Sequence, residues 1–254
     1  MTAKKTGADA SSTDDTSKKT SASKAKSGKK PAAKRKKAAA KGAKSATSAD
    51  KPTTPKKPSA AAEMAAAVVS GESDKTITDL GDELAGNKKS VAAQAARVLD
   101  EVVELKPDAV VPIIDRYAAV IGGPARRPAQ AAAKALPLMA RVAPARVARH
   151  LPKLKESYDD ATTPGKDGLV RTFAGLCTAS VAYQKRLEDE LNKALAEADA
   201  KTLIQWAQVV LPALKGEPHA RARQTVESRL GRIPKVHAQK IADFLGIKLR
   251  LRYR

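Results

Sequence analysis

Residues 88–114 read KKSVAAQAARVLDEVVELKPDAVVPII, and this stretch decides the expected fold. Pro107 lacks a backbone N–H and is expected to end the helix that precedes it. The chain is rich in Ala and only 3% aromatic, which favours closely packed helices over sheets. We therefore expect an all-α protein. Apolar side chains at helical spacing define the buried face of that helix: Val91, Ala95, Val98, Leu99, Val102 and Leu105.

Segments like the first part of this stretch recur along the chain. The twelve residues that end at Leu99, Leu136, Leu176 and Leu230 read KKSVAAQAARVL, ARRPAQAAAKAL, GKDGLVRTFAGL and HARARQTVESRL. Each segment follows a turn, opens with polar or basic residues and ends in Leu. The leucines are 37, 40 and 54 residues apart, and a period near 40 with two helices per unit is typical of an α-solenoid. The sequence therefore predicts a solenoid of about four or five helical pairs.

Gly and Pro residues separate the expected helices. Ser59 is expected to cap the first helix and Gly71 to end it, while Asp74 is expected to cap the second, which ends at Gly86. The predicted helices cover about 60–70, 75–85, 88–105, 108–121, 125–142, 145–159, 165–181, 184–198, 200–214, 219–231 and 234–245.

The segment PDAVVPII, together with the helix before it, resembles a HEAT repeat. In that family a short helix containing a Pro packs against a second helix that opens with a charged turn, and Pro112 and Pro152 match the kinking Pro. The resemblance covers about residues 75–245 and is best over 87–123 and 124–163. It implies a HEAT-like α-solenoid. Because HEAT repeats serve many functions, it says little about activity.

An N-terminal tail (1–58) precedes the predicted repeat domain (59–245) and has a different composition. The tail contains no aromatic residue and no Ile, Leu or Val, and its 17 Lys or Arg against 4 Asp give a net charge of +13. Such a segment cannot bury enough apolar surface to offset its ordering entropy, so we expect disorder. Its composition resembles linker-histone tails and bacterial Lys/Ala-rich nucleoid proteins. A polyanion is the expected partner of its densest basic run: Lys29, Lys30, Lys34, Arg35, Lys36 and Lys37.

A second group of cations recurs nine or ten residues before the aligned leucines. These positions are predicted to fall in the first turn of the second helix of each unit, where backbone N–H groups and basic side chains together suit a phosphate. One interpretation is a ladder of phosphate contacts on one surface. In the other interpretation, the cations pair with Asp of a neighbouring repeat or face water. The five residues, called the ladder below, are Lys89, Arg126, Arg127, Lys166 and Arg221.

The C-terminal extension (246–254) alternates apolar and basic residues. In an extended strand, one side would be apolar and the other basic. The basic side could follow a phosphate backbone while the apolar side packs on the last helix; addition to a sheet edge of another protein is an alternative. The candidate phosphate contacts in this extension are Arg250, Arg252 and Arg254.

The sequence offers no catalytic or metal-binding pattern. His150, His219 and His237 lack a ligand spacing, and Cys177 lies in an apolar helical stretch that indicates core packing. We expect no cofactor, no small-molecule substrate and no enzyme activity. One cysteine, the absence of a secretory signal and the absence of an 18-residue apolar run indicate a cytoplasmic protein with no membrane partner.

These observations together predict sequence-independent nucleic-acid binding in a nucleoid or chromatin setting, with DNA preferred to RNA as the partner. Base readout is not expected, because the chain has no helix-turn-helix, zinc or RNA-binding motif and few aromatics for stacking. One alternative is a protein-interaction scaffold whose charged tail docks acidic proteins. Another is association with RNA or ribosomes.

Overall fold

A computed structural model of the chain describes residues 59–248. The chain divides into two units, Met1–Pro52 and Thr53–Arg254, and the described residues belong to the second. The predicted tail disorder, the Lys29–Lys37 run and the last three arginines of the extension therefore lie outside the described residues.

Between residues 59 and 248 the chain is all-α, without strands. The expected fold class is confirmed at this level. The elements in chain order are α1 (Ala60–Ser70), α2 (Ile77–Ala85), α3 (Lys89–Leu105), the 3₁₀ helix η1 (Pro107–Ile113), α4 (Ile114–Val120), α5 (Arg126–Val142), α6 (Pro144–Ala148), α7 (Leu151–Asp160), α8 (Thr163–Ala179), α9 (Val181–Glu197), α10 (Ala200–Ala213), α11 (Gly216–Arg229), the 3₁₀ helix η2 (Leu230–Arg232) and α12 (Lys235–Leu245).

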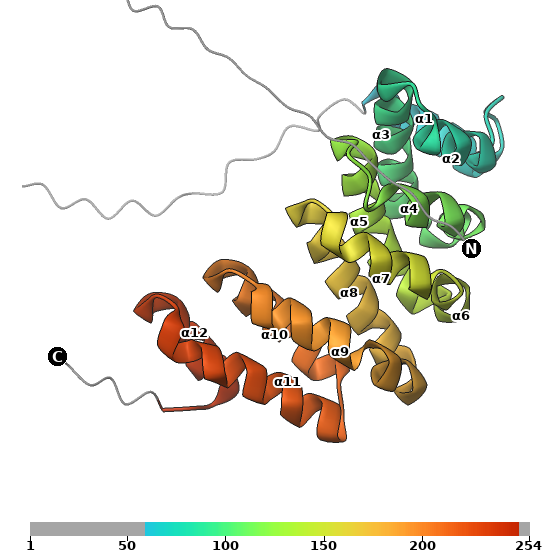
Figure 1. Ribbon diagram of the computed structural model, residues 1–254. Helices are drawn as coiled ribbons and strands as arrows, with labels where there is room; N and C mark the ends of the chain where they lie inside the picture. The colour runs from blue at the N-terminus through green and yellow to red at the C-terminus, as the bar shows by residue number, and fades with distance from the viewer. Residues whose placement is uncertain (1–58, 249–254) are drawn as a thin grey trace, which may run out of the picture. The chain divides into compact units, whose positions relative to one another are not determined.

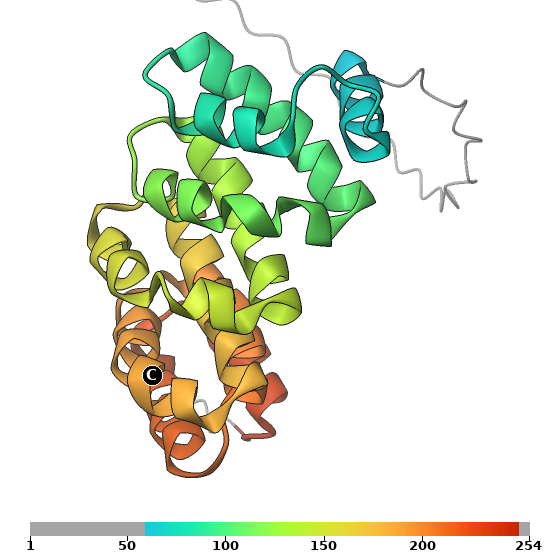
Figure 2. The ribbon, with the colours of Figure 1, turned by 90° about the vertical axis from the view of Figure 1, so that its right-hand side faces the viewer.

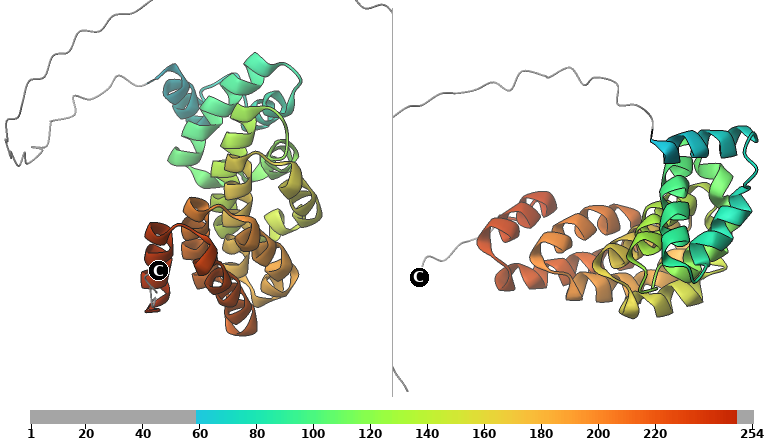
Figure 3. Two further views of the ribbon diagram at one scale, coloured as in Figure 1. Left: turned by 60° about the vertical axis from the view of Figure 1, so that its left-hand side comes forward. Right: turned by 90° about the horizontal axis from the view of Figure 1, so that it is seen from above.

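The helices form two facing rows (Figures 1 and 2). In the first row α3 packs on α5, α5 on α8, α8 on α10 and α10 on α12. In the second row α2 packs on α4, α4 on α7 and α9 on α11, and side-chain bonds join α7 to α9. Helix α1 packs against α3, so α1 and α12 lie at opposite ends of the first row (Figure 3).

Capping explains where the first two helices begin. The Ser59 hydroxyl accepts a hydrogen bond from the Ala62 N–H (3.2 Å), as expected, and Gly71 ends α1 with a positive φ of 83°. The expected cap Asp74 is wrong. Thr76 caps α2 instead, in a reciprocal arrangement in which Asp79 accepts from the Thr76 backbone N–H and Thr76 accepts from the Asp79 N–H.

Two predicted helices are broken where the sequence carries Pro. The expected helix 108–121 begins as η1 and becomes α-helical only at Ile114, because Pro112 cannot donate an α-helical hydrogen bond. The expected helix 145–159 is divided into α6 and α7, with a turn at Arg149 and His150. Pro152 then occupies the first turn of α7, where its missing N–H has no helical partner to lose.

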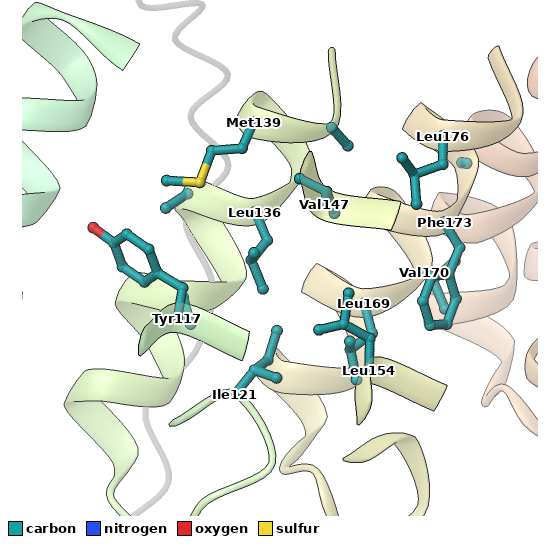
Figure 4. Close-up of a cluster of buried hydrophobic side chains, with 14 of the residues drawn as sticks. Tyr117, Ile121, Leu136, Met139, Val147, Leu154, Leu169, Val170, Phe173 and Leu176 are labelled. Atoms are coloured by element: carbon teal, nitrogen blue, oxygen red, sulfur yellow. The ribbon is translucent and has the colours of Figure 1, made fainter. Parts of the chain in front are cut away.

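The core is continuous along both rows and consists mainly of Ala, Leu, Val and Ile side chains. Figure 4 shows its central part, where Tyr117, Leu136 and Phe173 are buried between rows. Two residues of the expected buried face of α3 are not buried: Val91 is half-buried, and Leu105, in the last turn, is 58% exposed. The four aligned leucines also differ in burial. Three of them are fully buried, whereas Leu230 starts η2 in a half-buried position.

The closest packing of the first row joins α5 and α8. A Cβ placed on Gly168 would lie 2.5 Å from the Cβ of Ala133, so these helices approach more closely than a larger residue allows. Gly175, seven residues later, faces Ala140, seven residues after Ala133. Because both pairs keep the same offset, α5 and α8 run in the same direction. Figure 2 shows α3 running in the same direction as α5 and α8.

Gln184, a buried residue of α9, links the two rows near the C-terminal ends of α8 and α10. The Gln184 amide nitrogen donates to the carbonyl oxygens of Cys177 (3.0 Å) and Ala213 (3.2 Å), and its oxygen accepts from the Lys215 N–H (3.2 Å). One side chain therefore satisfies three backbone groups that the helix ends leave open.

Candidate functional site

Three neighbouring helices of the first row begin without a side-chain cap and without an acidic residue in the first turn: α3, α5 and α8. By contrast, α1, α2, α9 and α10 have side-chain caps. The three uncapped helices share a direction, so their first turns lie along one edge of the row (Figure 2). Four ladder cations follow this edge: Lys89, Arg126, Arg127 and Lys166.

The four cations of this edge have different surroundings. Lys89 and Arg126 are exposed and form no ion pair with any residue of the 59–248 region. Arg127 is exposed, and its charge acts on the Asp100 carboxyl group. Lys166 is half-buried, with Nζ 5.0 Å from the ring centroid of Tyr158. The edge therefore presents its most accessible positive charge at α3 and α5.

Arg221 does not belong to the same edge. It is the sixth residue of α11, beyond the first turn, and α11 packs on α9 in the second row. The Arg221 guanidinium forms ion pairs with Glu188 (3.1 Å) and Glu217 (3.3 Å). Arg221 therefore fits the alternative interpretation, in which a ladder cation pairs with a carboxylate of a neighbouring unit.

Sequence analysis considered ion pairs between neighbouring units only for the ladder cations, but four of the five pairs between consecutive helices of the rows involve other cations. Their partners are consistently 33 to 35 residues apart, a shorter interval than the leucine spacings. These pairs could have been found in the sequence by looking for a carboxylate and a cation that are 33 to 35 residues apart, in either order. The pairs are Asp82–Arg116 (2.7 Å), Asp100–Lys134 (3.8 Å), Lys155–Glu190 (3.4 Å), Asp159–Lys193 (2.6 Å) and Glu188–Arg221 (3.1 Å).

A groove of about 710 Å³ runs along the same row, over α3, α5, α8 and the side of α10. Its apolar floor includes Pro137 and the 38% exposed Leu138. Burial raises the pKa of Asp100 on its wall, although the nearby charges of Lys134 and Arg127 act in the opposite direction. The charged lining is balanced between carboxylates and cations: Asp100, Glu104 and Asp167 against Lys134, Arg141 and Arg171.

Trp206 is buried, and so is Cys177, which the sequence analysis placed in the core. The Trp206 indole Nε1–H donates to the Asp167 carboxylate (2.9 Å), which also pairs with Arg171 (2.8 Å). Burial raises the pKa of the Cys177 thiol to about 12, so this thiol is un-ionised near neutral pH. Both side chains therefore lie in environments typical of a packed core.

Positive charge is distributed unevenly along the chain. Residues 59–214 contain 20 Lys or Arg and 20 Asp or Glu, so this part is neutral. Residues 215–254 contain 11 Lys or Arg and 3 Asp or Glu, a net charge of +8. The described cations of this second part lie on α11, η2 and α12 or directly beside them in the chain, and the exposed ones include Arg232, Lys240 and Lys248. The entire net charge after residue 58 therefore belongs to the C-terminal end.

Within residues 59–248, no group of three or more His, Cys, Asp or Glu side chains is arranged to hold a metal ion. None of the helices in that range combines the length and the apolar character that crossing a membrane requires. Comparison with family models, with curated proteins and with solved structures found no match to the chain.

Proposed function

We propose that this chain binds nucleic acid, DNA in preference to RNA, without reading the base sequence. The observation that carries the proposal is the net charge of +13 in residues 1–58 together with +8 in residues 215–254. Lys and Arg side chains at such density attract phosphates and release condensed counterions, which supplies affinity for any sequence. The choice of DNA and of a nucleoid setting rests on the compositional resemblance of the tail.

We also propose that the two facing rows are an α-solenoid of HEAT-like helical pairs. Two observations support this architecture: the order in which neighbouring helices contact each other and the ion pairs at intervals of 33 to 35 residues. In such a stack the exposed cations Lys89 and Arg126 lie at uncapped helix starts on one edge. A phosphate placed there would accept hydrogen bonds from free backbone N–H groups as well as from side chains.

The proposal is tested by retardation of duplex DNA in gels at several salt concentrations. If about eight phosphates are engaged, the logarithm of the binding constant should fall with the logarithm of salt at a slope of about −7. Duplexes of equal length and unrelated sequence should bind equally, and duplex RNA of that length should compete less well. No retardation in dilute buffer, or a slope flatter than about −2, would contradict the proposal.

A matched pair of variants assigns the binding to the tail. The tail variant replaces the six cations of the 29–37 run with Gln. The control variant replaces six exposed cations of the neutral part with Gln: Arg97, Lys106, Arg146, Arg149, Lys153 and Lys185. The tail variant should have a salt slope smaller in magnitude by about five, whereas the control should keep the slope of the unmodified protein. Equal losses in both variants would show that total charge alone decides affinity.

A protein-interaction scaffold is the second candidate, and the 710 Å³ groove favours it. A groove with an apolar floor and a balanced charged rim suits a peptide better than a phosphate backbone. Partners captured from a lysate that remain bound after complete nuclease digestion would favour the scaffold. Partners that are all released by nuclease would favour nucleic-acid binding.

A further inference from the structure

The charge of the chain falls into three consecutive parts. Residues 1–58 carry +13, residues 59–214 carry no net charge, and residues 215–254 carry +8. A protein that follows one duplex along its whole length would gain from positive charge throughout. This chain instead has two cationic regions separated by a neutral one.

The two cationic regions adjoin different ends of the described helices. The first region joins at Ser59, before α1, and the second begins with α11 and continues through α12. Because α1 packs on α3 while α12 lies at the far end of the first row, these points are at opposite ends of that row (Figures 1 and 3). Packed helices lie about 8–10 Å apart, so the four steps from α3 to α12 span roughly 32–40 Å.

The neutral part does not offer a continuous path for phosphates. Several of its cations are engaged by carboxylates of the next helix in the row, as in Arg116 with Asp82 and Lys193 with Asp159. The groove along the first row brings three carboxylates to the surface for its three cations. The exposed cations of the uncapped edge are therefore offset by carboxylates elsewhere in the neutral part, and net attraction for a polyanion resides in the two end regions.

At the C-terminal end the exposed cations are well placed for a polyanion. Arg232, Lys240 and Lys248 are exposed and form no ion pair with a described residue, and three more arginines follow in the sequence. The few carboxylates of this end are engaged in part, since Glu227 bonds Arg223 and Asp243 accepts from Gln239. This end therefore has its own capacity to hold phosphates.

We infer that the chain bridges two nucleic-acid duplexes, one held by the N-terminal tail and one by the C-terminal end, with the neutral helices as a spacer. This inference rests on the proposed nucleic-acid binding. Bridging is independent of sequence, because both regions act through phosphates.

The experiment measures capture of a second duplex by the full chain. A biotin-labelled duplex is fixed to beads, the protein is bound and washed, and a fluorescent duplex of unrelated sequence is added. The end variant replaces six C-terminal cations with Gln: Arg232, Lys240, Lys248, Arg250, Arg252 and Arg254. It is compared with the tail variant and with the neutral-part control described above, which also lose six charges each.

The unmodified protein and the control should capture the second duplex, whereas the tail variant and the end variant should each capture at least tenfold less. Both of these variants should still bind a single duplex, at lower affinity. Because the replaced side chains at 232, 240 and 248 are exposed, the helical circular dichroism of the end variant should not change.

Three outcomes would overturn the inference. One is binding of a single duplex by the unmodified protein without capture of a second. Another is undiminished capture by the end variant. A third is capture that requires paired copies, recognised if Val236→Ser with Phe244→Ser, which changes two exposed apolar residues of α12, abolishes capture without changing single-duplex affinity. Failure to bind any duplex would instead remove the proposed function, and the bridging inference with it.

Discussion

Gly168→Ala should destabilise the protein, because α5 leaves no room for one added carbon. The new Cβ would lie 2.5 Å from the Cβ and 2.8 Å from the carbonyl oxygen of Ala133, where ordinary contacts are 3.4 Å or longer. The second of these atoms belongs to the backbone of a helix, so relief requires α5 and α8 to move apart by about 1 Å. Overpacking of this kind costs about 1–3 kcal/mol or more.

A gain in helix propensity opposes this cost. Ala is about 1 kcal/mol better than Gly inside a helix. Because the added Cβ meets backbone atoms of α5, the cost falls at the upper end of that range, about 2–3 kcal/mol, and the net loss expected for Gly168→Ala is about 1–2 kcal/mol. With a urea dependence of about 2 kcal/mol per molar, the unfolding midpoint should fall by about 0.5–1 M. Urea titration followed by circular dichroism at 222 nm measures the shift.

Gly175→Ala provides the matched control. It lies two turns further along α8 and faces the same helix, but its added Cβ would lie 3.2 Å from Ala140 Cβ, which can be relieved by a few tenths of an ångström. The propensity gain should then leave the variant as stable as the unmodified protein, or more stable by up to about 1 kcal/mol. If Gly168→Ala unfolded at the same urea concentration as Gly175→Ala, or at a higher one, the close approach of α5 and α8 would be wrong.

Three further changes test other parts of the fold. Gln184→Ala leaves three backbone groups without partners and should lower the free energy of unfolding by about 2–4 kcal/mol, measured in urea. Asp199→Ala removes the cap of α10 and should cost about 1 kcal/mol at pH 7. Hydrogen bonds from the Thr202 backbone lower the pKa of Asp199 below its usual 3.8, so this stabilisation is present above pH 3.8 and is lost as pH falls through the folded-state pKa; urea titrations from pH 7 to pH 2.5 measure it. The Cys177 thiol, whose pKa burial raises to about 12, should react with a thiol reagent only when the protein unfolds, at a rate that follows the unfolded fraction.

Controls for these changes come from exposed positions. Gln208→Ala in α10 should change stability by less than about 0.5 kcal/mol. Asp189→Ala, also exposed, should cost little at pH 7. A loss at Asp199 that stays constant down to pH 2.5 would contradict the capping role, and rapid labelling of Cys177 in the absence of urea would contradict its burial.

Composition and apolar spacing were sufficient to predict the fold class and most helix bounds. The helix expected at 60–70 and its cap Ser59 are both confirmed, because the capping residue, the Ala-rich run and the closing Gly agree locally. The two breaks, after Ile113 and at Arg149, were missed because the apolar spacing continues across them, while the backbone follows the prolines. Local pattern determines where helices occur more reliably than where they bend.

The candidate site was harder to predict, because its geometry depends on the interval between contacting helices. The leucines gave intervals of 37, 40 and 54 residues, since Ala-rich helices offer many equivalent apolar positions for alignment. The ion pairs give 33 to 35, because the two charged groups of a pair must lie within about 4 Å of each other. The misplacement of Arg221 follows from the longest leucine interval, which crosses from one row to the other. The position of the net charge could have been read from the sequence by counting charges before and after residue 215.

The position of α12 at the end of its row has a mechanical consequence. This helix packs on α10 and on the short η2, and Arg223 of α11 donates to the Leu245 carbonyl oxygen at its C-terminal end. A molecule pulled from both ends would transmit tension from one helix to the next, and the joint between α10 and α12 would yield before the broad packing of α5 on α8. The C-terminal helix α12 would then peel away while the central helices stayed folded.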